Sequence, residues 1–252
     1  MIIPVNQLPS AGFGYNFPTI TIKPMTFLDV IKYTEDYPKD DDPLIKYLYD
    51  LDWVMKDDDK IKYCYLLDVD FLIFYKKLGT VSSDMSYSFS IKCPKCGKSL
   101  NKTLVLDKDI HFKQFDERIM KGAAVKLAGH TYDTIVPTLS EFMSVFNVYL
   151  RYRKVTDLKI IKIISLFKDF AGNGSNQIES DILNATHSDI TLLLALQDLY
   201  FDGVEPITMV CPDCARDGKG GEVTVGVDNL ISGFLGDIIK NCPITGDQII
   251  FK

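Results

Sequence analysis

A chain of 252 residues, 46% of them hydrophobic, is long enough to bury a proper core as one large domain or two small ones, and this composition excludes a disordered protein. The net charge of −6 and the pI near 5.1 disfavour a general binder of phosphate backbones, which usually carries a basic face. No apolar run approaches the roughly 18 residues of a membrane span, and Met1–Pro4 lacks the features of a signal peptide. We therefore expect that the protein has no membrane span and that it is synthesised in the cytoplasm.

The first 82 residues combine an irregular start with a mainly helical remainder. Residues 1–18 mix glycine and proline with aromatic side chains, which predicts an extended N-terminal arm of the kind that lies on a partner. Polar and apolar side chains alternate over residues 19–23, as in a short strand that Pro24 ends. Helical spacing then predicts a mainly helical domain over residues 19–82, with helices over 26–36, from Pro43 behind an Asp42 cap, and from Ile61 to Gly79.

Two Cys-x-x-Cys knuckles, each at the tip of a predicted hairpin, follow further along the chain. The first, Cys93-Pro94-Lys95-Cys96-Gly97, lies between segments of period two over residues 86–92 and 100–106. The second, Cys211-Pro212-Asp213-Cys214, lies between predicted strands over residues 207–210 and 222–227. The proline of each knuckle presets φ for a tight turn, and Gly97 can adopt the positive φ that such a turn requires.

The two knuckles together supply four thiolates, the number that a tetrahedral structural zinc site needs. We predict that one structural Zn²⁺ is bound by Cys93, Cys96, Cys211 and Cys214. Residues 97–210 separate the knuckles, but the entropy of closing a loop grows only logarithmically with its length. The alternatives are disulfides, a redox pair, which would need only one knuckle beside a βαβ pattern, and a catalytic zinc, which usually has three protein ligands.

The segment between the knuckles predicts a small inserted subdomain. It contains a hairpin over residues 123–127 and 130–136, and helices over 138–153, 155–171, 178–185 and from Ser188 onward. A further short helix is predicted over residues 230–239. The fold class expected is α+β, with a helical N-terminal part, split zinc-ribbon β-hairpins and a helical insert. The predicted domains are the arm (1–18), the helical domain (19–82), the split zinc ribbon (83–110 with 204–252) and the insert (111–203).

Outside the knuckles, the sequence gives no sign of a catalytic site. His111, His130 and His187 fall in no metal-binding signature, and no G-x-S-x-G elbow presents a nucleophile. The chain is therefore expected not to be an enzyme. Cys64 and Cys242 are expected to be reduced, with Cys64 on an apolar helix face.

Several short motifs resemble, in their order along the chain, the baseplate family of contractile-tail phages. These motifs are Leu8-Pro9-Ser10-x-Gly12, Ile22-Lys23-Pro24-Met25-Thr26, Asp68-Val69-Asp70-Phe71-Leu72 and Tyr87-x-Phe89-x-Ile91-x-Cys93-Pro94-x-Cys96-Gly97. This group comprises the T4-type baseplate hub subunits and hub-assembly proteins. The resemblance covers mainly residues 8–106, with a weaker continuation to the second knuckle, and the helical insert departs from it.

The resemblance implies a virion structural or assembly protein of the tail baseplate, in its hub or wedge region. Such a protein would be assembled in the host cytoplasm, would act through contacts with other baseplate and tail proteins, and would have no small-molecule substrate. The alternative is a zinc-ribbon nucleic-acid-binding or transcription-accessory protein. Its basic surface would consist of Lys92, Lys95, Lys98 and Lys102. The acidic side chains near the second knuckle, Asp213, Asp217 and Glu222, offset these charges, so nucleic acid is the less expected partner.

Overall fold

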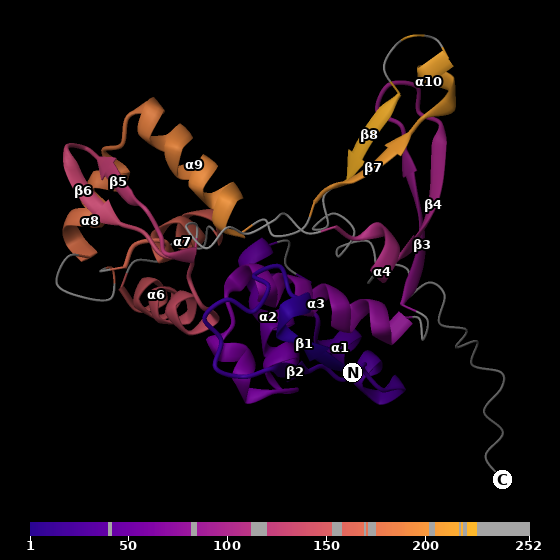
Figure 1. Ribbon diagram of the computed structural model, residues 1–252, viewed down its shortest axis with the longest axis horizontal. Helices are drawn as coiled ribbons and strands as arrows, with labels where there is room; N and C mark the ends of the chain where they lie inside the picture. Colours follow the sequence, from indigo (N-terminus) through magenta and orange to yellow (C-terminus); the bar gives the residue numbers. More distant parts are fainter. Residues whose placement is uncertain are drawn as a thin grey trace. The chain divides into compact units, whose positions relative to one another are not determined.

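A computed structural model describes residues 1–39, 42–81, 85–111, 120–152, 158–168, 170, 175–201, 205–216, 218 and 221–225. The fold is mixed α+β, and the strands among these residues form antiparallel two-stranded sheets (Figure 1). The chain divides into two compact units. Unit 1 comprises Met1–Lys23, Tyr37–Tyr75 and Phe112–Val204, and unit 2 comprises Pro24–Asp36, Lys76–His111 and Glu205–Lys252. Within the described part of the chain, no helix is long and apolar enough to cross a membrane.

The N-terminal residues are folded into unit 1, which differs from the extended arm expected over residues 1–18. Strand β1 (Ile2–Pro4) pairs antiparallel with β2 (Thr19–Thr21), with Ile3 opposite Ile20, and the short 3₁₀ helix η1 (Val5–Gln7) follows β1. The glycines that suggested irregular structure instead turn the chain back, since Gly12 and Gly14 have φ of 72° and 75°. Leu8 is only 2% exposed, so the segment is part of the core.

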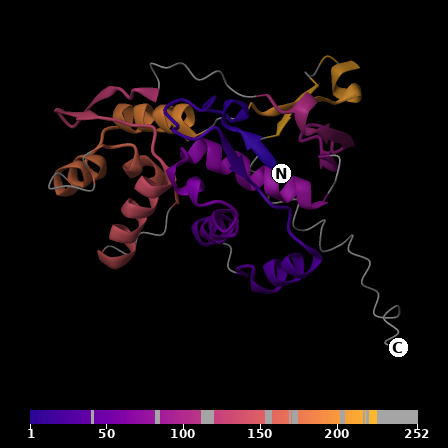
Figure 2. The same ribbon diagram turned by 60° about the horizontal axis from the view of Figure 1, so that its bottom comes forward.

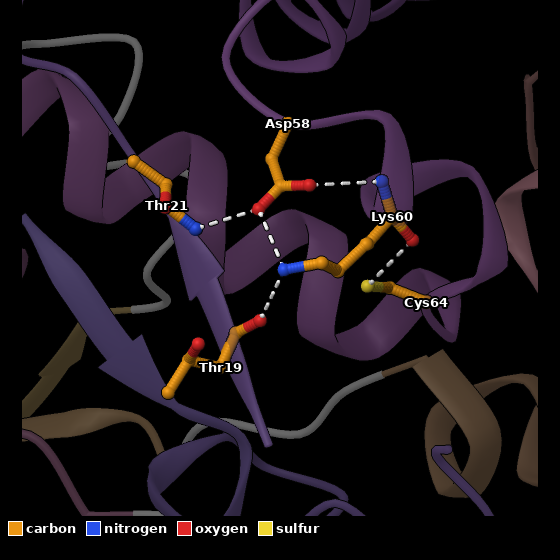
Figure 3. Close-up of polar contacts among 5 residues, drawn as sticks. All are labelled: Thr19, Thr21, Asp58, Lys60 and Cys64. Carbon is orange, nitrogen blue, oxygen red and sulfur yellow. Dashed lines mark hydrogen bonds and ion pairs between the residues drawn. The ribbon is translucent and has the colours of Figure 1, made fainter. Parts of the chain in front are cut away.

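Asp58 fastens strand β2 to the 3₁₀ helix η2 (Asp59–Tyr63), as Figure 3 shows. Its carboxylate accepts hydrogen bonds from the backbone N–H of Thr21 (2.9 Å) and of Lys60 (3.0 Å). The ammonium of Lys60 donates to the carbonyl of Thr19 (3.0 Å) and lies 3.4 Å from the Asp58 carboxylate. Cys64 follows η2 and is buried; it lies at the end of that helix, not on the predicted helix face.

Helices α2 (Pro43–Met55) and α3 (Leu66–Val81) complete the N-terminal helical part. Asp42 caps α2 as predicted, because its side chain accepts a hydrogen bond from the N–H of Leu44 (2.9 Å). Helix α3 continues through Gly79, where the sequence predicted its end. The added turn has its own partners: the Thr80 hydroxyl donates to the carbonyl of Lys76 (2.7 Å) and accepts from the N–H of Met25 (2.9 Å).

The larger part of the segment between the knuckles, Phe112–Val204, belongs to unit 1 together with the N-terminal residues. It forms the hairpin β5 (Ala124–Leu127) and β6 (His130–Asp133) and helices α6 (Leu139–Tyr152), α7 (Leu158–Ser165), α8 (Ser175–Leu183) and α9 (His187–Phe201), which lie together in Figure 1 and Figure 2. Helix α7 ends at Ser165, before the predicted end, because the chain then forms a bridge between Thr134 and Phe167. The N–H of Leu66 donates to the carbonyl of Pro137 (3.0 Å), which ties this segment to the start of α3.

Unit 2 carries both knuckles and helix α1 (Phe27–Asp36). Strands β3 (Ser86–Lys92) and β4 (Ser99–Val105) form one hairpin and α4 (Leu106–Asp109) follows it; β7 (Ile207–Val210) and β8 (Glu222–Val225) form the other hairpin, around α10 (Pro212–Arg216). The N–H of Glu205 donates to the carbonyl of His111 (2.8 Å), so the chain returns to unit 2 beside the residue at which it left. The helix predicted over residues 230–239 and Cys242 lie outside the described residues.

Candidate metal centre

The first knuckle is a tight turn closed by two backbone hydrogen bonds. The N–H of Cys93 donates to the carbonyl of Lys98 (2.8 Å), and the N–H of Gly97 donates to the carbonyl of Cys93 (2.8 Å). Gly97 has φ of 73°, which confirms the left-handed conformation predicted for it. The turn directs Cys93 inward, where it is buried, and leaves Cys96 exposed.

The second knuckle uses a short helix in place of a simple turn. The N–H of Cys211 donates to the carbonyl of Gly221 (2.7 Å), and the N–H of Ala215 donates to the carbonyl of Cys211 (3.0 Å) at the first turn of α10. Gly221 lies against this turn so closely that a Cβ atom would be 2.7 Å from the Cys211 carbonyl oxygen. The sequence indicated only a turn here; the requirement for glycine at residue 221 comes from this close approach.

The structure brings together the four cysteines predicted to form one site. Their sulfur atoms all lie within 4.8 Å of one another, although they come from two hairpins far apart in the sequence. Sγ of Cys93 is 3.8 Å from that of Cys214, and Sγ of Cys96 is 3.6 Å from that of Cys211. A regular tetrahedron with metal–sulfur bonds of about 2.3 Å has edges of about 3.8 Å. The arrangement therefore fits one tetrahedral metal ion, and all four thiols are free of disulfides.

Backbone donors and neighbouring thiols shift the cysteine pKa values in opposite directions. The N–H groups of Cys96 and Lys95 lower the pKa of Cys93 to about 7, because they favour its thiolate. The pKa of Cys214 is raised to about 12, first by its contact with the Cys96 thiol and then by burial. Four such groups cannot all ionise at this spacing without a cation, and a bound metal ion would supply that positive charge.

The acidic and basic side chains around the knuckles pair with one another. Lys98 Nζ lies 2.8 Å from the Asp213 carboxylate, which joins the two knuckles directly, and Lys102 Nζ lies 3.6 Å from that of Asp109. The Asp213 side chain raises the pKa of Lys98, first through the hydrogen bond and then through its charge. Two of the four lysines that would form a basic face are thus paired with carboxylates. Asp217 lies outside the described residues.

The three histidines form no metal site among the described residues, where the four cysteines are the one group suited to a metal ion. Nδ1 of His130 is 2.7 Å from Asp181, whose carboxylate also accepts hydrogen bonds from Tyr132 and from Gln177 (2.9 Å). These contacts tie β6 to α8. His187 begins α9, and the backbone carbonyl of His111 accepts the bond from Glu205.

The buried carboxylate of Asp68, on α3 in unit 1, is the centre of a second polar cluster, which was not predicted from the sequence. It accepts hydrogen bonds from the N–H and hydroxyl of Ser10 (2.8 and 2.6 Å) and from the Tyr15 hydroxyl (2.5 Å). Burial raises the pKa of Asp68 to about 6, although the bonds from Ser10 and Tyr15 oppose this shift. The same surroundings raise the pKa of the Cys64 thiol, mainly through burial. The cluster anchors the N-terminal residues to α3.

The Ser10 and Asp68 partners are 58 residues apart in the sequence, and nothing local in either segment marks the contact.

Comparison of the chain with protein-family models, with curated proteins and with solved structures gives no match.

Proposed function

We propose that the chain is a non-enzymatic structural or assembly component of a contractile phage tail baseplate, in the hub or wedge region. It acts through contacts with other baseplate and tail proteins, and one structural Zn²⁺ closes its split ribbon. The clustering of four thiols within 4.8 Å carries the metal part of this proposal. The baseplate part rests on the order of the motifs over residues 8–106 that resemble the phage family.

The donor set favours zinc over other common metal ions. Thiolates are soft ligands, and four of them in tetrahedral positions suit Zn²⁺ or iron, whereas calcium and magnesium take oxygen ligands. Four protein ligands leave no open position for water or substrate, which is the pattern of a structural zinc. Zinc held by Cys93, Cys96, Cys211 and Cys214 would neutralise the thiolates and fasten the two hairpins together.

Exposed apolar side chains support a function through protein contacts. On α1 of unit 2, the adjacent Phe27 and Leu28 are 60% and 59% exposed. On α9 of unit 1, Ile190 and Leu194 lie one turn apart and are both exposed. Apolar side chains left exposed on a helix are available for contacts with another protein. The nucleic-acid alternative has less support, because the chain carries a net charge of −6, whereas binders of phosphate backbones are usually basic.

Metal analysis of the purified chain tests the zinc part. We expect one zinc ion per chain by mass spectrometry, and we expect Cys211→Ser to lose it and to unfold at a lower temperature. Cys64→Ser is the matched control, because Cys64 is also buried but lies outside the cluster, so this variant should keep the metal. A wild-type chain without metal, equal in thermal stability to Cys211→Ser, would contradict the proposal.

Analysis of phage particles tests the baseplate part. We expect the chain in purified tails or in baseplate intermediates, detected by mass spectrometry, and we expect tails to be missing when its gene is inactivated. Normal tails in the absence of the chain would refute the baseplate function whatever the metal content. A mobility shift with DNA or RNA that weakens as salt is added would favour the nucleic-acid alternative instead.

A further inference from the structure

A groove of about 450 Å³ lies between the two hairpins of unit 2. It is lined by Lys98, the residue before β4, by consecutive residues of β4 from Ser99 to Lys102, and by consecutive residues of β7 from Thr208 to Val210, with Pro212. Successive side chains of a strand point to opposite faces, so a surface lined by consecutive residues follows the edge of the strand. The groove therefore runs along one edge of β4 and one edge of β7.

These two edges are the ones that face away from the hairpin partner of each strand. Strand β4 pairs with β3 and β7 pairs with β8, and among the residues that the structure describes each pair forms a two-stranded sheet. The bond from Cys211 to Gly221 fixes the alternation in the second hairpin, and that from Cys93 to Lys98 fixes it in the first. In an antiparallel ladder every second residue directs its N–H and C=O away from the partner strand.

Cys211 and Lys98 form such bonds, so the residues next to them and every second residue onward direct their N–H and C=O groups away from the partner strand. These residues are Thr208 and Val210 on β7 and Ser99 and Asn101 on β4. All four residues line the groove. Val210 is also 61% exposed, although it is a large apolar residue within a strand. Such an edge is a template for an added strand.

The described residues that line the groove have cationic, polar or apolar side chains, and none of them is a carboxylate. Lys98, directly before β4, and Lys102 within it supply two positive charges four residues apart, and the alternation of a strand places residues at this spacing on the same face. Their carboxylate partners, Asp213 and Asp109, are not among the lining residues. An added strand that alternates acidic with aliphatic side chains would complement both the charges and the apolar residues.

We propose that this groove binds an extended acidic segment of a partner protein, which adds a strand between β4 and β7. The groove thereby gives the chemistry of one partner for the protein contacts proposed above, and the inference rests on that proposed function. Backbone hydrogen bonds to both edges provide affinity, and Lys98 with Lys102 select for acidic side chains.

The test uses the full zinc-loaded chain and three fluorescent eight-residue peptides: one alternating Glu with Val, one alternating Lys with Val, and an N-methylated form of the Glu peptide. By fluorescence anisotropy, we expect the Glu peptide to bind at least tenfold more tightly than the Lys peptide. Methylation of the backbone nitrogens along one edge of the Glu peptide should weaken binding at least tenfold, because it removes the donors for the added strand. Equal binding of all three peptides, or no binding of the Glu peptide, would overturn the proposal.

Two proline variants of the same hairpin locate the site. Val210→Pro removes an N–H that points into the groove, whereas Glu222→Pro removes the N–H of the residue directly opposite, which points to the far edge of the sheet. We expect Val210→Pro to weaken binding of the Glu peptide at least tenfold and Glu222→Pro to change it less than twofold. Equal losses would place the peptide elsewhere and refute the assignment.

Zinc content and incorporation into tails, measured on the same variants, separate this proposal from the proposed function. If both are normal and the Glu peptide does not bind to wild type, only the groove proposal fails. If the wild-type chain lacks zinc and is absent from tails, the proposed function itself fails. Should Val210→Pro lose zinc, the N-methylated peptide still decides whether an added strand forms.

Discussion

Replacing Asp68 with Asn removes a titration that should make the stability of unit 1 depend on pH. The carboxyl group of Asp68 is 0% exposed and accepts its hydrogen bonds from Ser10 and Tyr15. Asn has nearly the same shape and can keep the bond from the Ser10 N–H, but it does not ionise. The variant therefore isolates the charge of this group.

The expected magnitude follows from the two pKa values. The pKa of Asp68 is about 6 in the folded chain and 3.8 without the protein's influence, so the folded state holds the proton more tightly. Stability from this group is therefore absent at pH 7.5, grows as pH falls through 6, and is complete below 3.8. Between pH 7.5 and pH 5.0 the linkage relation gives a gain of about 1.4 kcal/mol.

Urea unfolding of wild type and Asp68→Asn at both pH values measures this gain. The fluorescence of Trp53, the single tryptophan of the chain, follows unit 1, which also contains Asp68. The free energy of unfolding of wild type minus that of the variant should rise by about 1.4 kcal/mol at pH 5.0. The difference cancels the titration of other carboxyl groups and of the knuckle cysteines, which both proteins share.

The reasoning would be refuted if this difference were the same at pH 7.5 and pH 5.0. That result would mean that the hydrogen bonds from Ser10 and Tyr15 outweigh burial and keep the pKa of Asp68 near its ordinary value. A fall of the difference at pH 5.0 would reverse the sign and show that the folded state prefers the ionised carboxylate.

Three further changes test other parts of the fold. Deleting residues 1–17 should destabilise unit 1 by about 3 kcal/mol or more, because the buried side chains of Ile3 and Leu8 and the pairing of β1 with β2 are lost; an unchanged urea midpoint would contradict this. Gly221→Ala should speed the transfer of zinc to a chromogenic chelator, since its Cβ would meet the Cys211 carbonyl, and an unchanged rate would show that the knuckle adapts. Asp58→Ala should cost about 1 to 3 kcal/mol in urea unfolding, whereas Asp57→Ala, which loses an exposed hydrogen bond to the N–H of Lys23, should cost less; equal losses would argue against the fastening of β2 by Asp58.

The sequence predicted best the features that depend on neighbouring residues. The hairpin around Cys93 was placed correctly because alternation along two strands and a Cys-x-x-Cys turn are both local patterns. The Asp42 cap of α2 was predicted for the same reason. Even the meeting of the two knuckles could be inferred, because a tetrahedral metal ion needs four ligands and each knuckle has only two.

Features that depend on distant contacts were missed or wrong. The N-terminal segment looked like an arm, because its glycines and prolines are typical of irregular structure. Its order comes instead from bonds to Asp68 and from the stacking of Tyr15 on Tyr65, about 50 residues away in the chain. The end of α3 was misplaced at Gly79, because the bond from Met25 to Thr80 that stabilises the added turn also spans distant residues.

The hydrogen bond between Glu205 and His111 has a consequence for how chains of this type can vary. The chain leaves unit 2 after His111 and re-enters it at Glu205, and the hydrogen bond holds these two residues together. The metal site therefore sets no requirement on the number of residues between them. Insertions or deletions within that segment can alter unit 1 and its exposed helices while the spacing of the four sulfur atoms stays the same. Unit 1 can thus change the proteins that it contacts while the four cysteines of unit 2 keep their arrangement.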